Sequence, residues 1–251
     1  MRPRPVLAAA VMLATLGGAV LLRAQDNYEI QVYGAALVPT GRTMLELHSN
    51  FTLEGSAEAA EGVYPTRHAL HETLEITHGF TDWFEVGFYA FSSARSGYGW
   101  QWVGDHVRPR ITAPAGWGVP VGLSLSQEIG YQRRAFAEDT WTWEIRPIID
   151  QQLGRWYWSL NPTLERSLRG ANVGAGFELA PNAVVAVDLT RKINAALEYY
   201  AAFGPVTGFN HPVNQEQQVF PAVNLDLGSD WEFNAGVGAG FTHATDHLWS
   251  S

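Results

Sequence analysis

The chain has 251 residues, enough for one large domain or two small ones, and only 16% of them are charged. Glycine (25) and tryptophan (10) are abundant, cysteine is absent, and the formal net charge is −9. The lack of cysteine excludes disulfides, thiolate metal sites, a cysteine nucleophile and a lipid-anchored cysteine. The acidic balance argues against a nucleic-acid partner.

The first 24 residues have the pattern of a secretory signal peptide. Two arginines precede an uncharged apolar stretch from Val6 to Leu22, and a small residue stands directly before Gln25. The alternative, an uncleaved anchor helix, needs about 20 apolar residues, and this stretch is slightly short. We expect residues 1–24 to be removed. Because they contain three arginines and no acid, their removal takes the net charge from −9 to −12.

The dominant pattern in the rest of the chain is an alternation of apolar and polar side chains, which is typical of β-strands with two unlike faces. In residues 43–54, for example, Leu45 and Leu47 fall on one face, and Glu46 and His48 fall on the other. Eleven strands are predicted on this basis: 43–54, 69–78, 84–92, 100–111, 119–132, 141–150, 156–165, 172–189, 193–203, 219–227 and 231–241.

Two of these strands are irregular. In 100–111, Trp100 and Trp102 share parity with Arg108, which places them on its face of the strand. We expect aromatic residues on one face and the arginine on the other, so a β-bulge is predicted between them. The segment 172–189 is interpreted as one bent strand.

The links between strands and the tryptophans favour a membrane barrel over a soluble β-protein. Short links alternate with longer, more polar ones, as expected for the two rims of a transmembrane barrel. Tryptophans occur at both kinds of strand end: Trp83, Trp117, Trp156 and Trp231 beside short links, and Trp100, Trp102, Trp141 and Trp143 beside long ones. Two aromatic belts at the lipid boundaries explain this distribution, whereas a soluble β-sandwich explains only the alternation.

We therefore predict an all-β, antiparallel, up-and-down transmembrane β-barrel of about 12 strands, formed by residues 43–251. In this register the first strand runs outward and the short turns are periplasmic. Residues 25–42 are expected to be an extended periplasmic N-terminal segment. The predicted location is the outer membrane of a Gram-negative-type bacterium, reached through the cleaved signal peptide.

An odd strand count is unusual for a bacterial single-chain barrel. Residues 242–251 have the pattern of an outer loop followed by the first residues of a twelfth strand. An unpaired strand edge cannot lie in lipid, because its backbone groups would lack partners. Three explanations stay open: a truncated or frameshifted sequence, which we favour, a miscount, or pairing by residues 28–33.

Several runs resemble known outer-membrane proteins. The runs YEIQVYG (28–34), VPTGR (38–42) and LELHSNF (45–51) resemble the start of uncharacterised acidobacterial-type outer-membrane proteins. The runs EITHGFTDWFEVG (75–87) and GVGAGFT (236–242) are similar to the "meta-pathway of phenol degradation" outer-membrane family. This resemblance implies a barrel, a channel for hydrophobic compounds, and a last strand ending in an aromatic residue that the assembly machinery reads.

Charged residues on the predicted inward faces are the candidate site. They lie on three neighbouring strands: Arg108, Arg110, Glu128, Glu144, Arg146 and Asp150. One interpretation is a structural network that pairs charges and fills a narrow lumen. The other is a constriction that selects solutes by charge.

We expect no metal site, no cofactor and no catalytic residues. His68 and His71 have a helical spacing but face opposite sides of a strand, and His243 and His247 lie in a loop. Ser49 beside His48 does not define a catalytic triad. The alternating glycines Gly236, Gly238 and Gly240 are interpreted as relieving crowding inside the lumen, because no helix follows them to bind phosphate.

The predicted function is an outer-membrane channel or transporter for small molecules, with hydrophobic compounds as the class that the resemblance implies. Two alternatives stay open: a plugged or structural barrel without flux, and a lipid-modifying outer-membrane enzyme. The expected partners are the lipid bilayer of the outer membrane, the outer-membrane assembly machinery and a small-molecule solute.

Overall fold

The computed structural model describes residues 28, 30–228, 231–242, 244–245 and 248–250. The predicted signal peptide, residues 1–24, lies outside the described residues. The described chain is almost entirely antiparallel β-structure, with three short 3-10 helices: η1 (Ala115–Trp117), η2 (Val173–Ala175) and η3 (Pro212–Asn214). None of the helices in the described part of the chain is long and apolar enough to cross a bilayer.

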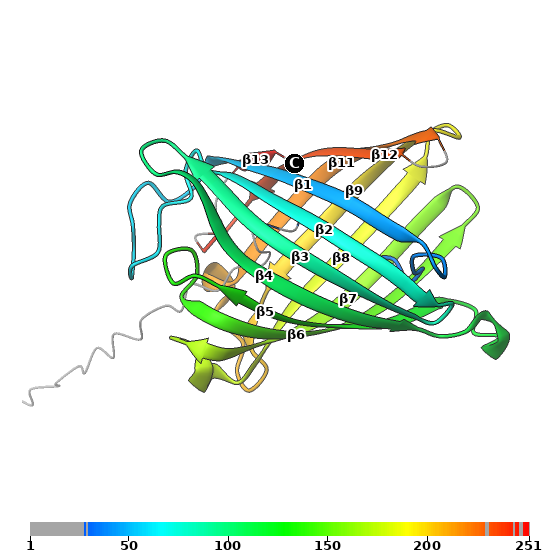
Figure 1. Cartoon of the computed structure of the whole chain (residues 1–251), viewed down its shortest axis with the longest axis horizontal. Coiled ribbons are helices and arrows are strands. Elements are labelled where there is room, and N and C mark those ends of the chain that lie inside the picture. The colour runs from blue at the N-terminus through cyan, green and yellow to red at the C-terminus, as the bar shows by residue number, and fades with distance from the viewer. Residues whose placement is uncertain (1–27, 29, 229–230, 243, 246–247, 251) are drawn as a thin grey trace, which may run out of the picture.

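The strands follow one another up and down around a strongly curled sheet (Figure 1). In chain order they are β1 (Thr43–Glu54), β2 (Leu70–Thr81), β3 (Phe84–Arg95), β4 (Gly99–Thr112), β5 (Gly122–Gln132), β6 (Asp139–Leu153), β7 (Trp156–Gly170), β8 (Phe177–Asp188), β9 (Ile193–Ala202), β10 (Gly204–Pro205), β11 (Glu216–Gly228), β12 (Trp231–Gly240) and β13 (Leu248–Ser250). Apart from the two-residue β10, which pairs with β8 in a loop, each strand pairs with its neighbours in this order.

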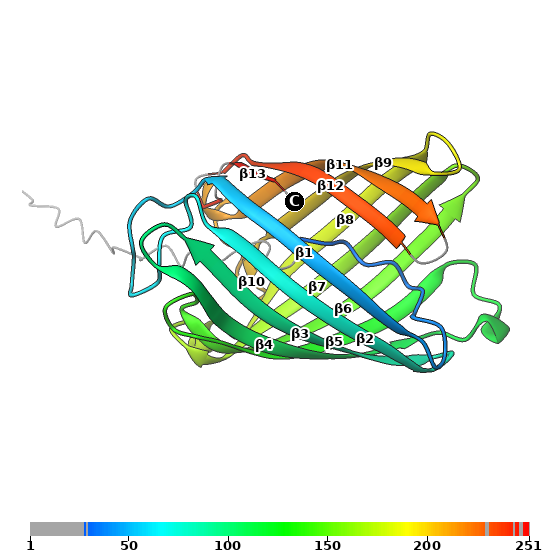
Figure 2. The ribbon, with the colours of Figure 1, turned by 45° about the horizontal axis from the view of Figure 1, so that its top comes forward.

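The sheet curls into a barrel-like shape with an open seam between β1 and β12. The three-residue β13 pairs with both strands at one end, opposite Phe51 and Thr52 on one side and Val237–Ala239 on the other. Over the rest of their length, in the described part of the chain, no strand lies between them (Figure 2). The seam is therefore one strand wide at the end that β13 occupies.

The predicted alternation of faces is confirmed along the sheet. In β1, Leu45 and Leu47 are 67% and 69% exposed on the outer face, whereas Asn50 and Thr52 are buried on the inner face. The outer face is largely apolar, and the tryptophans near both rims are exposed on it: Trp83, Trp100, Trp102, Trp117, Trp141, Trp156 and Trp231. The inner face is largely polar, so the usual arrangement of a soluble protein is inverted.

The β-bulge predicted in the fourth strand is confirmed. The register between β3 and β4 shifts at this point, so that Phe91 faces Gly104 while Ser92 faces Trp102. Val103 is the extra residue, and its side chain is buried. The bulge places Trp102 on the outer face although Arg108 lies on the inner one.

Residues 172–189 do not form one bent strand, so that prediction is wrong at its N-terminal end. The strand before it continues to Gly170, a short 3-10 turn follows, and β8 begins only at Phe177. Gly176 has a φ of +80°, a conformation that interrupts a strand and that glycine adopts readily. The loop lengths differ from expectation at two places: the link 113–121 contains η1, and the link 96–98 is short because β3 and β4 extend further than predicted.

The described residues 28 and 30–42 run through the inside of the curled sheet before β1 begins. In Figure 2 the dark-blue trace passes behind β1, on the inner side. Tyr28 contacts His71 and Phe91 near the rim with the long first loop, and Gly41 bonds to Gly79 at the opposite rim. The sequence predicted an extended periplasmic segment; the contacts of its described part lie inside the curled sheet.

Candidate functional site

The six charged residues predicted to face inward do so, and five of them are arranged in separate pairs or clusters. Arg108, Arg110 and Arg146 are at most 4% exposed, and Glu128 is 8% exposed. Their partners, however, are not mainly one another. The sequence predicted that these residues pair with one another across three strands. In the structure their side chains pair mainly with acids and a histidine that the prediction omitted.

Arg108 reaches across β3 to an acid on β2. Its nearest neighbour on β3 is Gly87, which has no side chain to block the guanidinium group. Arg108 therefore donates to Glu75 Oε1 at 2.8 Å and to Thr77 Oγ1 at 3.3 Å. It also lies 3.5 Å from Glu85, which in turn is 3.7 Å from Arg110. Two arginines and two carboxylates thus form one buried cluster.

The remaining predicted charges form two smaller groups. His106 lies over Gly130 and its Nδ1 hydrogen-bonds to Glu128. Arg146 pairs with Glu144 two residues earlier on the same strand, at 2.7 Å. Buried ion pairs of this kind contribute little net stability but are costly to break, because removing one partner leaves an uncompensated charge.

Tyr33 of the N-terminal segment lies among the three buried arginines. The guanidinium carbons of Arg108, Arg146 and Arg110 are 4.5, 4.7 and 5.5 Å from the centre of its ring. Its hydroxyl is 2.9 Å from the hydroxyl of Tyr89, with either group able to donate. Cations over an aromatic face are attracted by its quadrupole, most strongly where water is excluded. The charged network therefore holds an aromatic side chain of the chain itself.

The backbone around Tyr33 is also bonded to the wall of the barrel. Because this segment is not a strand, its backbone groups need side-chain partners once they are buried. The amides of Tyr33, Ala35 and Val38 donate to Asn161, Asp150 and Glu85 at 2.9, 2.9 and 2.7 Å. In the other direction, the Tyr33 carbonyl accepts from Ser159 and Asn161, and the Gly34 and Ala36 carbonyls accept from Arg110.

The opposite side of the interior carries two apolar clusters, with buried polar residues such as Asn182 and Gln218 on the same strands. Ile30 and Val32 pack against buried side chains of β8, β9 and β11: Ala180, Val184, Ala186, Ala196, Tyr200, Ala202, Phe220 and Ala222. On β12, a Cβ at Gly238 would lie 2.0 Å from the ring of Phe220. This contact supports the interpretation that a lumen glycine relieves crowding. The segment thus meets a charged wall on one side and two apolar clusters on the other.

A cavity of about 550 Å³ lies beside the segment at the rim with the short turns. It is lined by Ala35 and Ala36 of the segment and by wall residues that include Thr112, Gly122, Asp150 and Tyr157. The Tyr157 hydroxyl donates to Asp150 at 2.9 Å, and the same carboxylate accepts from the Ala35 amide. Asp150, the sixth predicted charge, therefore anchors the segment where it borders this cavity.

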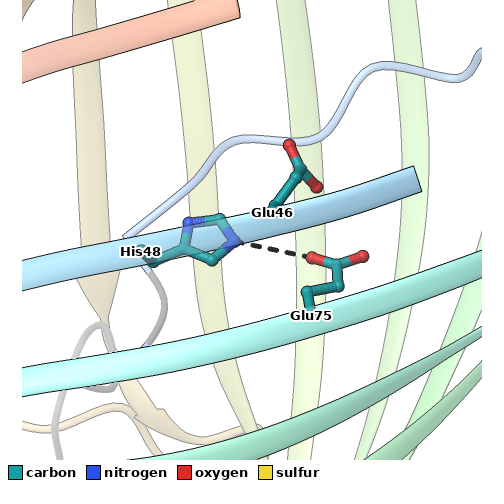
Figure 3. A group of neighbouring side chains, drawn as sticks. All are labelled: Glu46, His48 and Glu75. Atoms are coloured by element: carbon teal, nitrogen blue, oxygen red, sulfur yellow. Dashed lines mark ion pairs between the residues drawn. The ribbon is translucent and has the colours of Figure 1, made fainter. Parts of the chain in front are cut away.

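A second group of polar side chains lies on the inner face of β1 and β2. Glu46 and Glu75 are directly opposite in the register of these strands, and His48 is two residues further along β1 (Figure 3). The ligand atoms of these three residues lie within 4.8 Å of one another. Ser49, weighed with His48 from the sequence, hydrogen-bonds outward to Glu72, away from the inward-facing His48. His243 and His247 lie outside the described residues.

Sequence reasoning missed several residues of this interior: Tyr33, Glu46, His48, Glu75, Glu85 and His106. The parity that identified Arg108 and Glu128 as inward-facing also places Glu75, Glu85 and His106 inward. Alternation could therefore have found the acids and the histidine. It could not have found Tyr33, because the segment that carries it has no strand periodicity.

Comparisons with protein families and with curated proteins find no match for this chain. The resemblance to the phenol-degradation outer-membrane family therefore stays a prediction.

Proposed function

We propose that the protein is an outer-membrane β-barrel whose interior is closed at rest by its own residues 30–40. In this state it passes ions and small solutes weakly or not at all. The observation that carries the proposal is that three backbone amides of the segment, those of Tyr33, Ala35 and Val38, donate to side chains of the wall. A segment that merely followed the barrel rim would leave these amides to water.

The membrane location is supported by the outer surface. Leucines, valines and phenylalanines cover it, tryptophans lie near both rims, and the polar residues gather inside. Exposing so much apolar surface to water would be unfavourable, at roughly 25 cal/mol per Å².

In lipid, the backbone groups of β1 and β12 along the seam also require a strand partner, and β13 meets this need only at one end.

A second candidate function is transport of small apolar molecules after the segment moves. The apolar clusters on β8, β9 and β11 support it, because withdrawal of Ile30 and Val32 would uncover both of them. The charged wall on the other side would then present Arg108, Arg110 and Arg146 to the lumen. The family resemblance also favours hydrophobic solutes.

The test is the conductance of the chain from Gln25 onward, refolded into liposomes and fused to a planar bilayer. We expect little current from this protein and stable open-channel current from a variant that begins at Val38. Resistance to extraction by alkaline carbonate shows whether each protein is inserted, and circular dichroism shows whether each is folded. The shortened variant is compared only where both conditions hold.

Three outcomes separate the possibilities. Insertion with equal, large currents from both proteins would contradict closure by the segment. Insertion with no current from either would contradict a channel hidden behind it and leave the plugged barrel. Failure of the chain from Gln25 onward to resist carbonate extraction would contradict the membrane location itself.

A further inference from the structure

We propose that Glu46, His48 and Glu75 bind one divalent transition-metal ion of the zinc type on the inner wall of the barrel. The proposal concerns neither conduction nor closure, and it stands or fails independently of the proposed function. It also departs from the expectation, drawn from histidine spacing in the sequence, that the chain has no metal site.

The strand geometry brings the three donors together. Side chains two residues apart in a strand point to the same face, so Glu46 and His48 both face inward from β1. Glu75 is directly opposite Glu46 on β2. Figure 3 shows the imidazole of His48 directed toward the Glu75 carboxylate, with Glu46 beside it on the same strand. Two carboxylates and one imidazole are a donor set that zinc accepts.

The distances fit a shared ion. His48 Nε2 and Glu75 Oε2 are 3.5 Å apart, and all three donor atoms lie within 4.8 Å of one another. Two ligands on one tetrahedral zinc, each about 2.0–2.1 Å from it, are about 3.3 Å apart. The imidazole and the Glu75 carboxylate thus need to move little, and the Glu46 carboxylate lies within 4.8 Å of both.

Glu75 supplies the independent observation that points to a ligand. Its side chain is fully buried, and its two oxygens have different surroundings. Oε1 accepts from Arg108 at 2.8 Å and from Thr77 at 2.6 Å. Oε2 is directed at His48, whose Nε2 lies 3.5 Å away as an ion pair too long for a good hydrogen bond. Outer partners that fix one oxygen and leave the other aimed at a metal are the usual second shell of a metal-binding carboxylate.

The charges are consistent with a cation at this place. Two carboxylates directly opposite on neighbouring strands repel each other, and burial of Glu75 strengthens the effect. Arg108 compensates on one side only, since it bonds Oε1 and is shared with Glu85. A divalent ion between Glu46 and Glu75 would remove the repulsion. Three protein ligands leave a fourth position for water or a solute, as in zinc sites that are not closed.

The test is a zinc titration of the refolded chain from Gln25 onward in detergent, after removal of metals with a chelator. Isothermal titration calorimetry should show one saturable equivalent of zinc. His48→Gln and Glu46→Gln should each weaken binding by at least about tenfold, the loss that even second-shell changes produce. His78→Gln is the matched control, because His78 lies on β2 at the rim and bonds to Thr43 outside this group.

X-ray absorption at the zinc edge gives a readout that does not depend on affinity. The native protein should show one imidazole among nitrogen and oxygen ligands, and this signature should be lost in His48→Gln. Circular dichroism confirms that each variant is folded. The absence of a saturable equivalent in the native protein overturns the proposal, and so does equal zinc affinity in His48→Gln or an equal loss in His78→Gln.

Discussion

Tyr33 is the residue whose replacement should release the N-terminal segment most readily. It is 5% exposed, its ring faces three guanidinium groups, and its hydroxyl bonds to Tyr89. Two substitutions divide these contacts. Tyr33→Phe keeps the ring and loses the hydroxyl, whereas Tyr33→Leu keeps an apolar side chain and loses both.

The two substitutions should differ strongly in how much they weaken docking of the segment. Losing one buried hydrogen bond costs about 1 kcal/mol, which would raise the fraction of undocked segment roughly fivefold. Three cation–ring contacts at about 0.5–1 kcal/mol each add about 1.5–3 kcal/mol. For Tyr33→Leu the total is about 2.5–4 kcal/mol. This loss raises the undocked fraction by roughly two to three orders of magnitude.

The assay uses a cysteine at Ala35 as a reporter. The chain has no cysteine of its own, and Ala35 is 3% exposed inside the barrel. Labelling of Ala35→Cys by a bulky maleimide in liposomes should be slow and limited by undocking, so its rate follows the undocked fraction when redocking is fast. Tyr98→Leu, a change at an exposed tyrosine near the rim, is the control and should leave the rate unchanged.

Rapid labelling in the protein with Tyr33 intact would refute burial of the segment. Equal rates for the phenylalanine and leucine variants would refute the contribution of the three arginines, because only the leucine variant removes the ring. A rate increase in the control as large as in Tyr33→Leu would show that labelling reports general loosening.

Three further predictions concern the wall, each measured as the free energy of unfolding by urea titration in lipid vesicles. Leu197→Arg, on the outer face in the middle of β9, should cost about 2–4 kcal/mol, and Leu227→Arg near a strand end about 0–1 kcal/mol; equal small costs would indicate a surface in water. Arg108→Met should cost about 3–5 kcal/mol, since it removes the closest cation from the buried Glu75 carboxylate; a cost near zero would contradict the buried cluster. Gly238→Ala should cost about 1–3 kcal/mol by overpacking, and adding Phe220→Leu should restore much of it; no recovery would place the clash elsewhere.

The strands could be predicted because their two faces differ in polarity, which gives the sequence a regular alternation. One face of each strand must be apolar and the other polar, so the period of two identifies both the strand and its orientation. The segment 43–54 matches β1 in its bounds. The mismatch in parity between Trp102 and Arg108 was enough to predict the bulge that the structure has at Val103.

The errors have local physical causes. Residues 172–189 continue to alternate in hydrophobicity while the backbone turns, because Gly176 adopts a conformation outside the strand region. Alternation also cannot choose partners within a face. Arg108 bonds to Glu75 on β2 because Gly87 leaves the path across β3 open, and this depends on side-chain volume rather than on parity.

The position of the N-terminal segment depends on contacts that no local pattern encodes. Its backbone follows neither a strand nor a helix, and its partners, such as Asn161 and Asp150, are more than one hundred residues away in the chain. From the sequence these polar residues were identified only as inward-facing. The curled sheet places Asn161 and Asp150 beside the N-terminal segment, where they bind its backbone amides.

Hydrogen exchange of the unaltered chain in lipid nanodiscs tests the central claim most directly. The amides of Tyr33, Ala35 and Val38 donate to side chains inside the barrel, so they should exchange far more slowly than the amides of residues 57–59 in an exposed loop. Mass spectrometry with fragmentation can resolve these positions. Protection at all three is the predicted result, and exchange as fast as that of the loop would contradict closure of the barrel by its own N-terminal segment.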